Sequence, residues 1–235
     1  MIGSNGYAKI AWHYNDYGDL VEEAYFGADG KPVDRHEGYA RFTRVDDKDG
    51  HVIEEAYFGT DGKPVAQKNG YAKVTHRCDP QGGVLEDAYF GPGGEPALNE
   101  QGYSRKVYIK DGRGVDVETE YFGTAGQPVL NDRGFSHAKI VNDDLGREIE
   151  WSYYGIRGES VIGKNSNAYH RATRKLDSQG NPLEFATFGL DGKPIEVVDS
   201  ESGRRCAKCV NRFDANNKQI GSQCFDAAGM PVSKQ

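Results

Sequence analysis

The sequence lacks the features by which several large classes of protein are recognised. No apolar run reaches the ~18 to 20 residues that a membrane-spanning helix needs, so we do not expect direct membrane insertion. The first residues, Met1 to Asn5, show neither the basic nor the apolar segment of an export signal. Hydrophobic residues make up only 37% of the chain and its mean hydropathy is −0.74. Both values argue against one thick globular core.

Motifs that carry chemistry are also missing. There is no Gly-x-Ser-x-Gly, no His-Glu-x-x-His and no phosphate-binding loop. His76 and Cys78 can share one face of a strand, but the sequence indicates no third partner. Basic residues are spread along a chain of formal charge −7, which argues against a nucleic-acid surface. We therefore expect no enzyme, no cofactor, no metal and no nucleic-acid partner.

Glycine (31 residues) and tyrosine (14) are abundant, and both recur with one period. The aromatic residue before a glycine or aspartate recurs at Phe26, Phe58, Phe90, Phe122, Tyr154, Phe188 and Phe225. The spacings are 32, 32, 32, 32, 34 and 37 residues. A second marker has the same spacings and falls at Tyr7, Tyr39, Tyr71, Tyr103, Phe135, Tyr169 and Cys206. Two independent markers with one period indicate a repeat array.

Three turns punctuate each repeat. Asp79-Pro80-Gln81-Gly82 fits a type I turn that closes into a G1 bulge. A second turn follows the aromatic pair, as in Gly59 to Gly62, and a third precedes the next repeat, as in Lys68 to Gly70. Between them lie two strand-like segments and a short Lys-Pro-Val piece, whose proline belongs on an edge or at a corner. These features predict an all-β fold, an open solenoid of about seven stacked β-hairpin repeats, with a β-propeller as the alternative.

We expect one repeat array over residues 1–235, elongated and monomeric. The repeats are predicted at approximately 6–37, 38–69, 70–101, 102–133, 134–167, 168–204 and 205–235. The last two are longer and diverge from the others, as C-terminal capping repeats do.

A resemblance to known repeats follows from these motifs. Gly70-Tyr71-Ala72-Lys73-Val74, a polar turn, then Ala88-Tyr89-Phe90-Gly91 and a Gly-x-Pro-hydrophobic close resemble the bacterial WG-type repeats, and more loosely the YD and MORN hairpin repeats. The resemblance covers most of the chain, although the Trp-Gly pair of the WG family is absent. It implies an accessory module of binding, adhesion or scaffolding.

Strand alternation sorts each hairpin into two faces. A three-residue loop would place Lys9 opposite Tyr25 and Ala11 opposite Glu23. The packed face would then carry Ala8, Ile10, Trp12, Ala24 and Phe26. The other face would carry tyrosines with a basic residue between them and an acid diagonally across. Alternation alone leaves the reverse assignment of inside and outside open.

Two interpretations of the tyrosine face are open. In the first, a ladder of tyrosines with flanking charges stacks sugar rings or grips an extended peptide. In the second, the tyrosines are half-buried strand residues and the charged pairs set the register. The candidate ligand-binding residues are Tyr7, Tyr25, Tyr39, Arg41, Tyr57, Tyr71, Lys73, Tyr89, Tyr103, Arg105 and Tyr121.

The cysteines near the end of the chain are a separate feature. Cys206 to Cys209 has CxxC spacing, which invites a zinc interpretation. Residues three apart on a strand point to opposite faces, however, and the nearest histidine is the distant His170. Cys206 and Cys224 stand at the two tyrosine positions of the last repeat, so they are candidates for a disulfide in an oxidising compartment, or else small residues of a cap. Cys78 is expected to be a free thiol beside a turn.

We therefore predict a non-enzymatic repeat module for protein or glycan recognition along the tyrosine-bearing face, within a larger bacterial protein. The alternative is a purely structural spacer or stalk that presents another domain. The compartment stays open, with the cell surface or secretion favoured over the cytoplasm.

Overall fold

The computed structural model describes residues 6–164, 168–198 and 203–232, and all regular structure in these ranges is β. Within these ranges no helix has the length and apolar character of a membrane span. The chain divides into two compact units: Met1–Tyr108 with Tyr121–Gln127, and Ile109–Glu120 with Pro128–Gln235.

Paired strands form the hairpins of the repeats. They are β1 (Lys9–Tyr14), β2 (Leu20–Phe26), β3 (Arg41–Asp46), β4 (Val52–Phe58), β5 (Lys73–Cys78), β6 (Val84–Phe90), β7 (Arg105–Lys110), β8 (Asp116–Phe122), β9 (His137–Asn142), β10 (Glu148–Tyr154), β11 (Arg171–Leu176), β12 (Pro182–Phe188), β15 (Lys208–Phe213) and β16 (Gln219–Phe225). Three short strands are added near the C-terminus: β13 (Val197–Val198), β14 (Arg205–Cys206) and β17 (Pro231–Val232).

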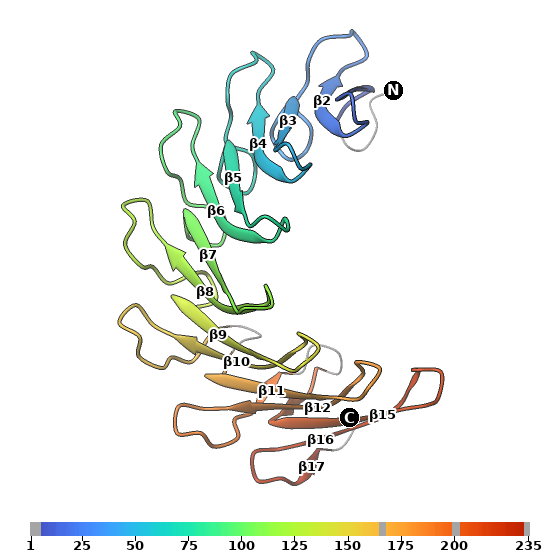
Figure 1. The fold of residues 1–235 in the computed structure, drawn as a ribbon, viewed down its shortest axis with the longest axis vertical. Helices are drawn as coiled ribbons and strands as arrows, with labels where there is room; N and C mark the ends of the chain where they lie inside the picture. Colours follow the sequence, from blue (N-terminus) through green and yellow to red (C-terminus); the bar gives the residue numbers. More distant parts are fainter. Residues whose placement is uncertain (1–5, 165–167, 199–202, 233–235) are drawn as a thin grey trace. The chain divides into compact units, whose positions relative to one another are not determined.

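The strands form antiparallel meanders. In the first compact unit the order is β1 to β6 and then β7 (Figure 1). In the second it is β8 to β12, then β15, β16 and β17, while β13 and β14 pair separately. Neighbouring repeats therefore share one sheet, whereas a propeller would place each repeat in its own blade. The predicted all-β fold of stacked hairpins is confirmed.

The hairpin turns have the predicted chemistry. The Asn15 side-chain oxygen accepts from the backbone amides of Tyr17 and Asp19 at 2.9 Å, and Gly18 has a φ of +88°. An aspartate makes the same contacts in later repeats, for example Asp79. In the last repeat Asn217 takes the left-handed position, with a φ of 62°.

In the hairpins whose registers are described, one bulge after the hairpin turn corrects the predicted cross-strand pairs. Near the turn Tyr14 lies opposite Leu20, but the register then passes over Val21 and places His13 opposite Glu22. As a result Lys9 pairs with Phe26 instead of Tyr25, and Ala11 pairs with Ala24 instead of Glu23. The residues passed over in the described registers are Val21, Ile53, Leu85, Ile149, Leu183 and Ile220. A one-residue shift moves side chains to new neighbours along the whole hairpin.

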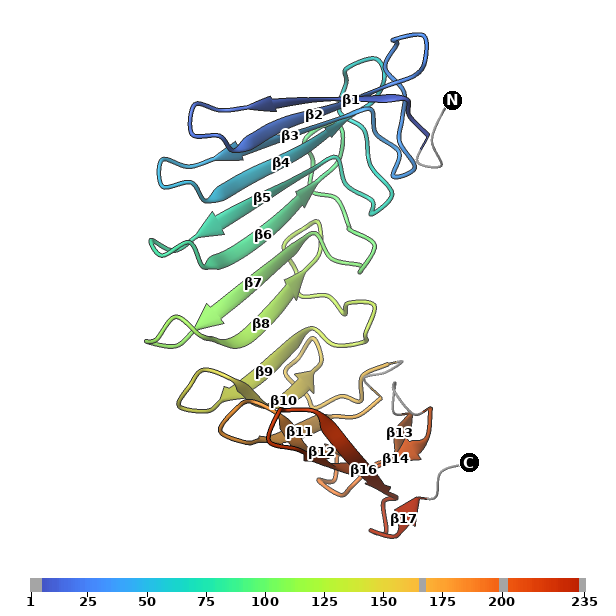
Figure 2. The ribbon, with the colours of Figure 1, turned by 90° about the vertical axis from the view of Figure 1, so that its right-hand side faces the viewer.

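The connecting segment of each repeat determines which face is buried. In the first compact unit these segments lie at one end of the strands and the hairpin tips at the other (Figure 2). After β2, Val33 donates its amide to the Tyr25 carbonyl at 3.0 Å, and the Arg35 guanidinium lies 5.0 Å from the Tyr25 ring centroid. Tyr25 is only 2% exposed. The tyrosine side is thus the packed one. The predicted faces are exchanged for the second strand of the hairpin, where Tyr25 and not Phe26 lies on the packed side, whereas Ile10 of the first strand lies opposite Tyr25 and so keeps its predicted side.

The short proline-containing pieces and the connecting segments also make backbone contacts that help to hold the repeats together. Pro32 and its equivalents form isolated bridges to the aromatic residue that ends the hairpin, at an edge as predicted. Successive segments are joined by backbone hydrogen bonds at the same period: Lys68 donates to Glu37 at 2.9 Å, and Glu100 donates to Asn69 at 2.7 Å.

We expect Tyr25→Ala to lower the free energy of unfolding by about 3 to 5 kcal/mol, the range for truncating a buried aromatic side chain. The matched control is Tyr17→Ala, because Tyr17 is 92% exposed and such surface changes cost about 0.5 kcal/mol or less. Urea denaturation followed by circular dichroism measures both. Equal midpoints for the two variants would show that the tyrosine side is not the core.

Candidate functional site

The predicted tyrosine positions form one continuous ladder in the first compact unit. The rings follow one another in the order Tyr7, Tyr25, Tyr39, Tyr57, Tyr71, Tyr89, Tyr103 and Tyr121, with successive centroids 4.8 to 6.0 Å apart. All seven of these contacts are tilted or edge-to-face, the geometry that aromatic pairs prefer. In the second unit Phe135, Tyr153 and Tyr169 form a corresponding stack, with centroids 4.2 and 5.5 Å apart.

Burial corrects the expectation that this ladder faces a ligand. Tyr25, Tyr39, Tyr103 and Tyr121 are 2% to 8% exposed, and the other members are partly buried. Burial raises the pKa of six phenols of the ladder, those of Tyr25, Tyr39, Tyr57, Tyr71, Tyr89 and Tyr103. The ring faces contact other rings, so they are not available to stack on a sugar.

Some ladder hydroxyls are held by the connecting segment. Arg35 donates from Nη1 to the hydroxyl of Tyr25 at 2.9 Å and to that of Tyr39 at 3.1 Å. The Tyr25 hydroxyl also donates to Glu23, and the Tyr103 hydroxyl donates to Gln101 at 2.7 Å. A buried hydroxyl needs such partners, and they come from the same or the adjoining repeat.

The three predicted basic residues, Arg41, Lys73 and Arg105, lie on the opposite face of the hairpins. The Arg41 guanidinium is 4.0 Å from the Phe58 ring centroid, and its Nη1 is 2.9 Å from Oε2 of Glu22 in the preceding repeat.

The same arrangement recurs at the other two positions. Arg105 lies over Phe122 and bonds Glu86 at 3.0 Å, and Lys73 lies over Phe90 with Glu54 at 3.3 Å. The aromatic partner is thus a phenylalanine instead of a tyrosine, because of the bulge. Each cation joins two consecutive repeats.

A cluster that the sequence did not indicate surrounds His76. Its Nδ1 is 2.7 Å from Oδ1 of Asp87, and the Tyr108 hydroxyl donates to Oδ2 of Asp87 at 2.9 Å. The hydrogen bond to Asp87 raises the pKa of His76, and burial raises the pKa of Tyr108. Three adjacent strands supply these residues, so their contact depends on sheet pairing. The sequence feature that could have indicated this cluster is Asp87, which stands where the first two repeats have a glutamate.

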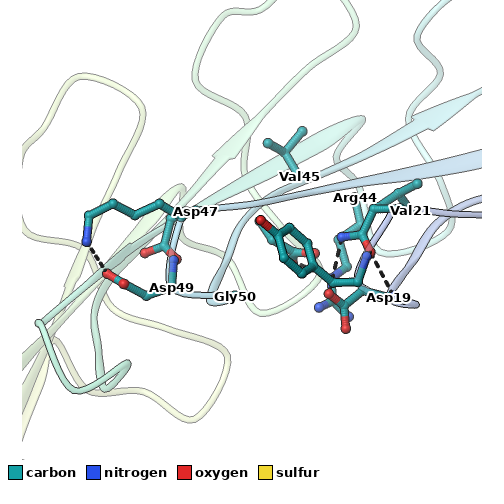
Figure 3. Close-up of a pocket in the computed structure, with 11 residues that line it drawn as sticks. Asp19, Val21, Arg44, Val45, Asp47, Asp49 and Gly50 are labelled. Atoms are coloured by element: carbon teal, nitrogen blue, oxygen red, sulfur yellow. Dashed lines mark hydrogen bonds and ion pairs between the residues drawn. The ribbon is translucent and has the colours of Figure 1, made fainter.

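A cavity of about 510 Å³ lies between the tips of the first two hairpins (Figure 3). Among the charged side chains of its lining, acidic ones outnumber basic ones: Asp19, Asp46, Asp47 and Asp49, against Arg44 and Lys48. The Asp46 side chain is 7% exposed; Oδ1 is 2.6 Å from Nε of Arg44, and Oδ2 has no hydrogen-bond partner in the described residues. By contrast, Asp47 Oδ1 accepts from the amides of its own turn.

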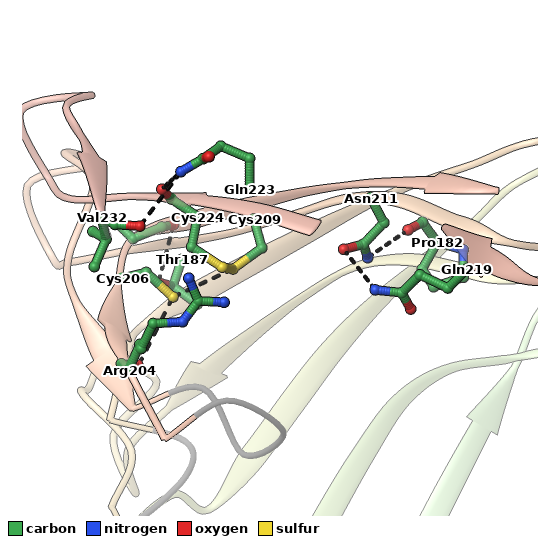
Figure 4. Close-up of a disulfide and its surroundings, with 11 residues drawn as sticks. Pro182, Thr187, Arg204, Cys206, Cys209, Asn211, Gln219, Gln223, Cys224 and Val232 are labelled. Carbon is green, nitrogen blue, oxygen red and sulfur yellow. Dashed lines mark hydrogen bonds between the residues drawn. A yellow bond between two sulfur atoms is a disulfide. The ribbon is translucent and has the colours of Figure 1, made fainter. Parts of the chain in front are cut away.

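The cysteine pairing differs from the predicted one. The disulfide joins Cys209 to Cys224, and Cys206 lies outside it (Figure 4). The bulge places Cys209 directly opposite Cys224, whereas the prediction placed Cys206 and Cys224 as diagonal neighbours. With two of the three sulfurs joined to each other, this form does not offer the thiolates of a zinc site. Cys78 is not disulfide-bonded, as predicted, and burial raises its pKa.

No family model matches the chain, and no curated protein matches it. Two similar solved structures are a chain of the Photorhabdus luminescens Tc holotoxin pore and a chain of the TcdB2-TccC3-TEV crystal structure. The first has a TM-score of 0.42 and 10% identity over 95% of this chain and 11% of that chain. The second has a TM-score of 0.39 and 13% identity over 96% and 14%. The chain therefore covers less than one sixth of either chain's length, and similarity at these scores carries no argument about function.

The raised phenol pKa values predict a loss of stability in alkali. These phenols have a pKa of about 10 in the unfolded chain and a higher pKa in the folded chain, so the unfolded chain releases their protons first as the pH rises. The stability that comes from burying the neutral phenols is therefore complete below about pH 10, and it falls as the pH rises toward the folded pKa. Tyr57→Phe/Tyr89→Phe removes two such groups and keeps the rings, so its urea midpoint should fall less steeply between about pH 9 and 11.5. Parallel midpoint curves for the two proteins would contradict burial of these phenols.

Proposed function

We propose that the chain is a non-enzymatic structural repeat module, a spacer or scaffold within a larger bacterial protein. The observation that carries this proposal is that the recurring residues make contacts between neighbouring repeats: tyrosine against tyrosine on one face, and cation against glutamate on the other. Side chains that contact the neighbouring repeat stabilise the array, and few of the recurring side chains are then left to contact a ligand. The resemblance to WG-type repeats, which stays a prediction, supports an accessory role.

The groups that could carry acid–base or nucleophilic chemistry support the non-enzymatic part of the proposal. The raised pKa of His76 keeps its ring protonated to a higher pH than that of a free histidine, which leaves less of the neutral form that could accept a proton, and its Nδ1 is engaged by Asp87. The raised pKa of Cys78 lowers its thiolate fraction.

The proposal is tested by excising residues 38–69, one whole repeat of 32 residues. We expect a folded β protein with a lower urea midpoint, because Tyr25 can meet Tyr71 as it now meets Tyr39 and one interface is lost. The matched control excises residues 38–53, half a repeat, and should unfold because the remaining strands are out of phase. If the whole-repeat excision unfolds like the control, the chain is not a modular scaffold.

A second candidate function, recognition of a protein partner at the hairpin tips, is favoured by the cavity between the first two tips. Asp46 Oδ2 is buried without a partner beside an acidic lining, and Tyr17 on the rim is 92% exposed. Four aspartates against one arginine and one lysine give the lining a net negative charge, which attracts a cationic side chain. The occupant that fits is a lysine or arginine side chain of a partner protein.

A peptide array of lysine- and arginine-containing sequences tests this second function. Asp46→Asn should weaken the Kd of any captured peptide at least about tenfold, and Tyr17→Ala should weaken it as well. The matched control is Asp61→Asn, in an exposed turn of the same compact unit with its own lysine partner. Binding that responds equally to Asp46→Asn and Asp61→Asn would reflect net charge and not the cavity.

A further inference from the structure

Three cysteine side chains converge at the C-terminal end of the described sheet. Cys206, Cys209 and Cys224 are 4%, 8% and 1% exposed, and their three sulfur atoms lie within 4.8 Å of one another. The Cys206 Sγ is 3.3 Å from the Cys209 Sγ, which is already bonded to Cys224 (Figure 4). We propose that these cysteines form a thiol–disulfide exchange site, in which the bond moves between Cys209–Cys224 and Cys206–Cys209.

The local backbone brings the third sulfur to the other two. Cys206 ends β14 and Lys208 begins β15, and the bend at Ala207 interrupts the strand between them. Residues three apart on an unbroken strand would point to opposite faces. Because of the bend, Cys206 reaches the side of the sheet that carries Cys209.

The exchange needs no external oxidant or reductant. The Cys206 thiol loses its proton, and the thiolate attacks the Cys209 Sγ and forms the new S–S bond. The old Cys209–Cys224 bond breaks, its electron pair goes to the Cys224 sulfur, and that sulfur takes up a proton. One thiol and one disulfide are present before and after, so atoms and electrons balance.

Exchange changes which strands are covalently joined. The Cys209–Cys224 bond spans 15 residues and links β15 to β16, and β17 pairs with β16. A Cys206–Cys209 bond would span three residues and link β14 to β15. The shorter bond constrains less of the chain, so β16 and β17 would be held by hydrogen bonds and packing alone. The site therefore determines whether the last hairpin is covalently closed.

Trypsin distinguishes the two pairings, because cleavage after Arg205, Lys208, Arg212 and Lys218 separates the three cysteines into three peptides. The experiment uses the full chain carrying Cys78→Ser, incubated near neutral and alkaline pH. It is then unfolded and alkylated at mildly acidic pH, where thiolate attack is slow. We expect both Cys209–Cys224 and Cys206–Cys209 peptides, the second in at least about 1% of molecules, a detectable minor state.

Two single variants complete the test. Cys224→Ser should form the Cys206–Cys209 bond on treatment with oxidised glutathione, seen as the loss of two hydrogens in the intact mass. Cys206→Ser should hold only Cys209–Cys224 and keep the circular dichroism spectrum of the parent, which is the folding control. Absence of Cys206–Cys209 peptides at every pH, or failure of Cys224→Ser to form that bond, would overturn the proposal.

Discussion

In the described hairpins, one residue after the turn forms a bulge and has no partner on the opposite strand. This bulge determines which side chains of the repeats contact one another. Without the bulge at Val21, Lys9 would lie opposite Tyr25; with it, Ile10 does. The same shift places phenylalanine opposite the basic residues and Cys209 opposite Cys224. A bulge adds one residue to one strand, and since side chains alternate with a period of two, this addition changes which residues share a face across the hairpin.

Two periodic rows follow from this register, and both stabilise the stack of repeats. On the packed face, tyrosines contact tyrosines of the same and the next repeat under the connecting segments. On the other face, a cation covers a phenylalanine of its own hairpin and bonds a glutamate of the preceding one. The half-exposed ion pairs contribute little individually, whereas the buried rings exclude water along the first compact unit.

Where a repeat departs from the common residue pattern, its side chains make contacts that the other repeats lack. Where Asp87 replaces glutamate, a histidine and a tyrosine from neighbouring strands bind it. Where tyrosine gives way to Thr187, Cys206 and Cys224, the aromatic stack of the second unit is followed by a buried threonine and a sulfur cluster. A repeat array can vary such positions singly because each repeat contacts mainly its neighbours.

The sequence by itself determined the period, the turns, the all-β class and the divergence of the last repeats, because these depend on local turn chemistry and on spacing. Only the tertiary structure decided which face is packed, which cysteines are bonded, and that Tyr108 and Asp87 meet His76. Strand alternation defines two faces but does not say which one the connecting segment covers. Contacts between strands depend on a bulge whose residue, Val21 or Ile53, looks like any other apolar strand residue in the sequence.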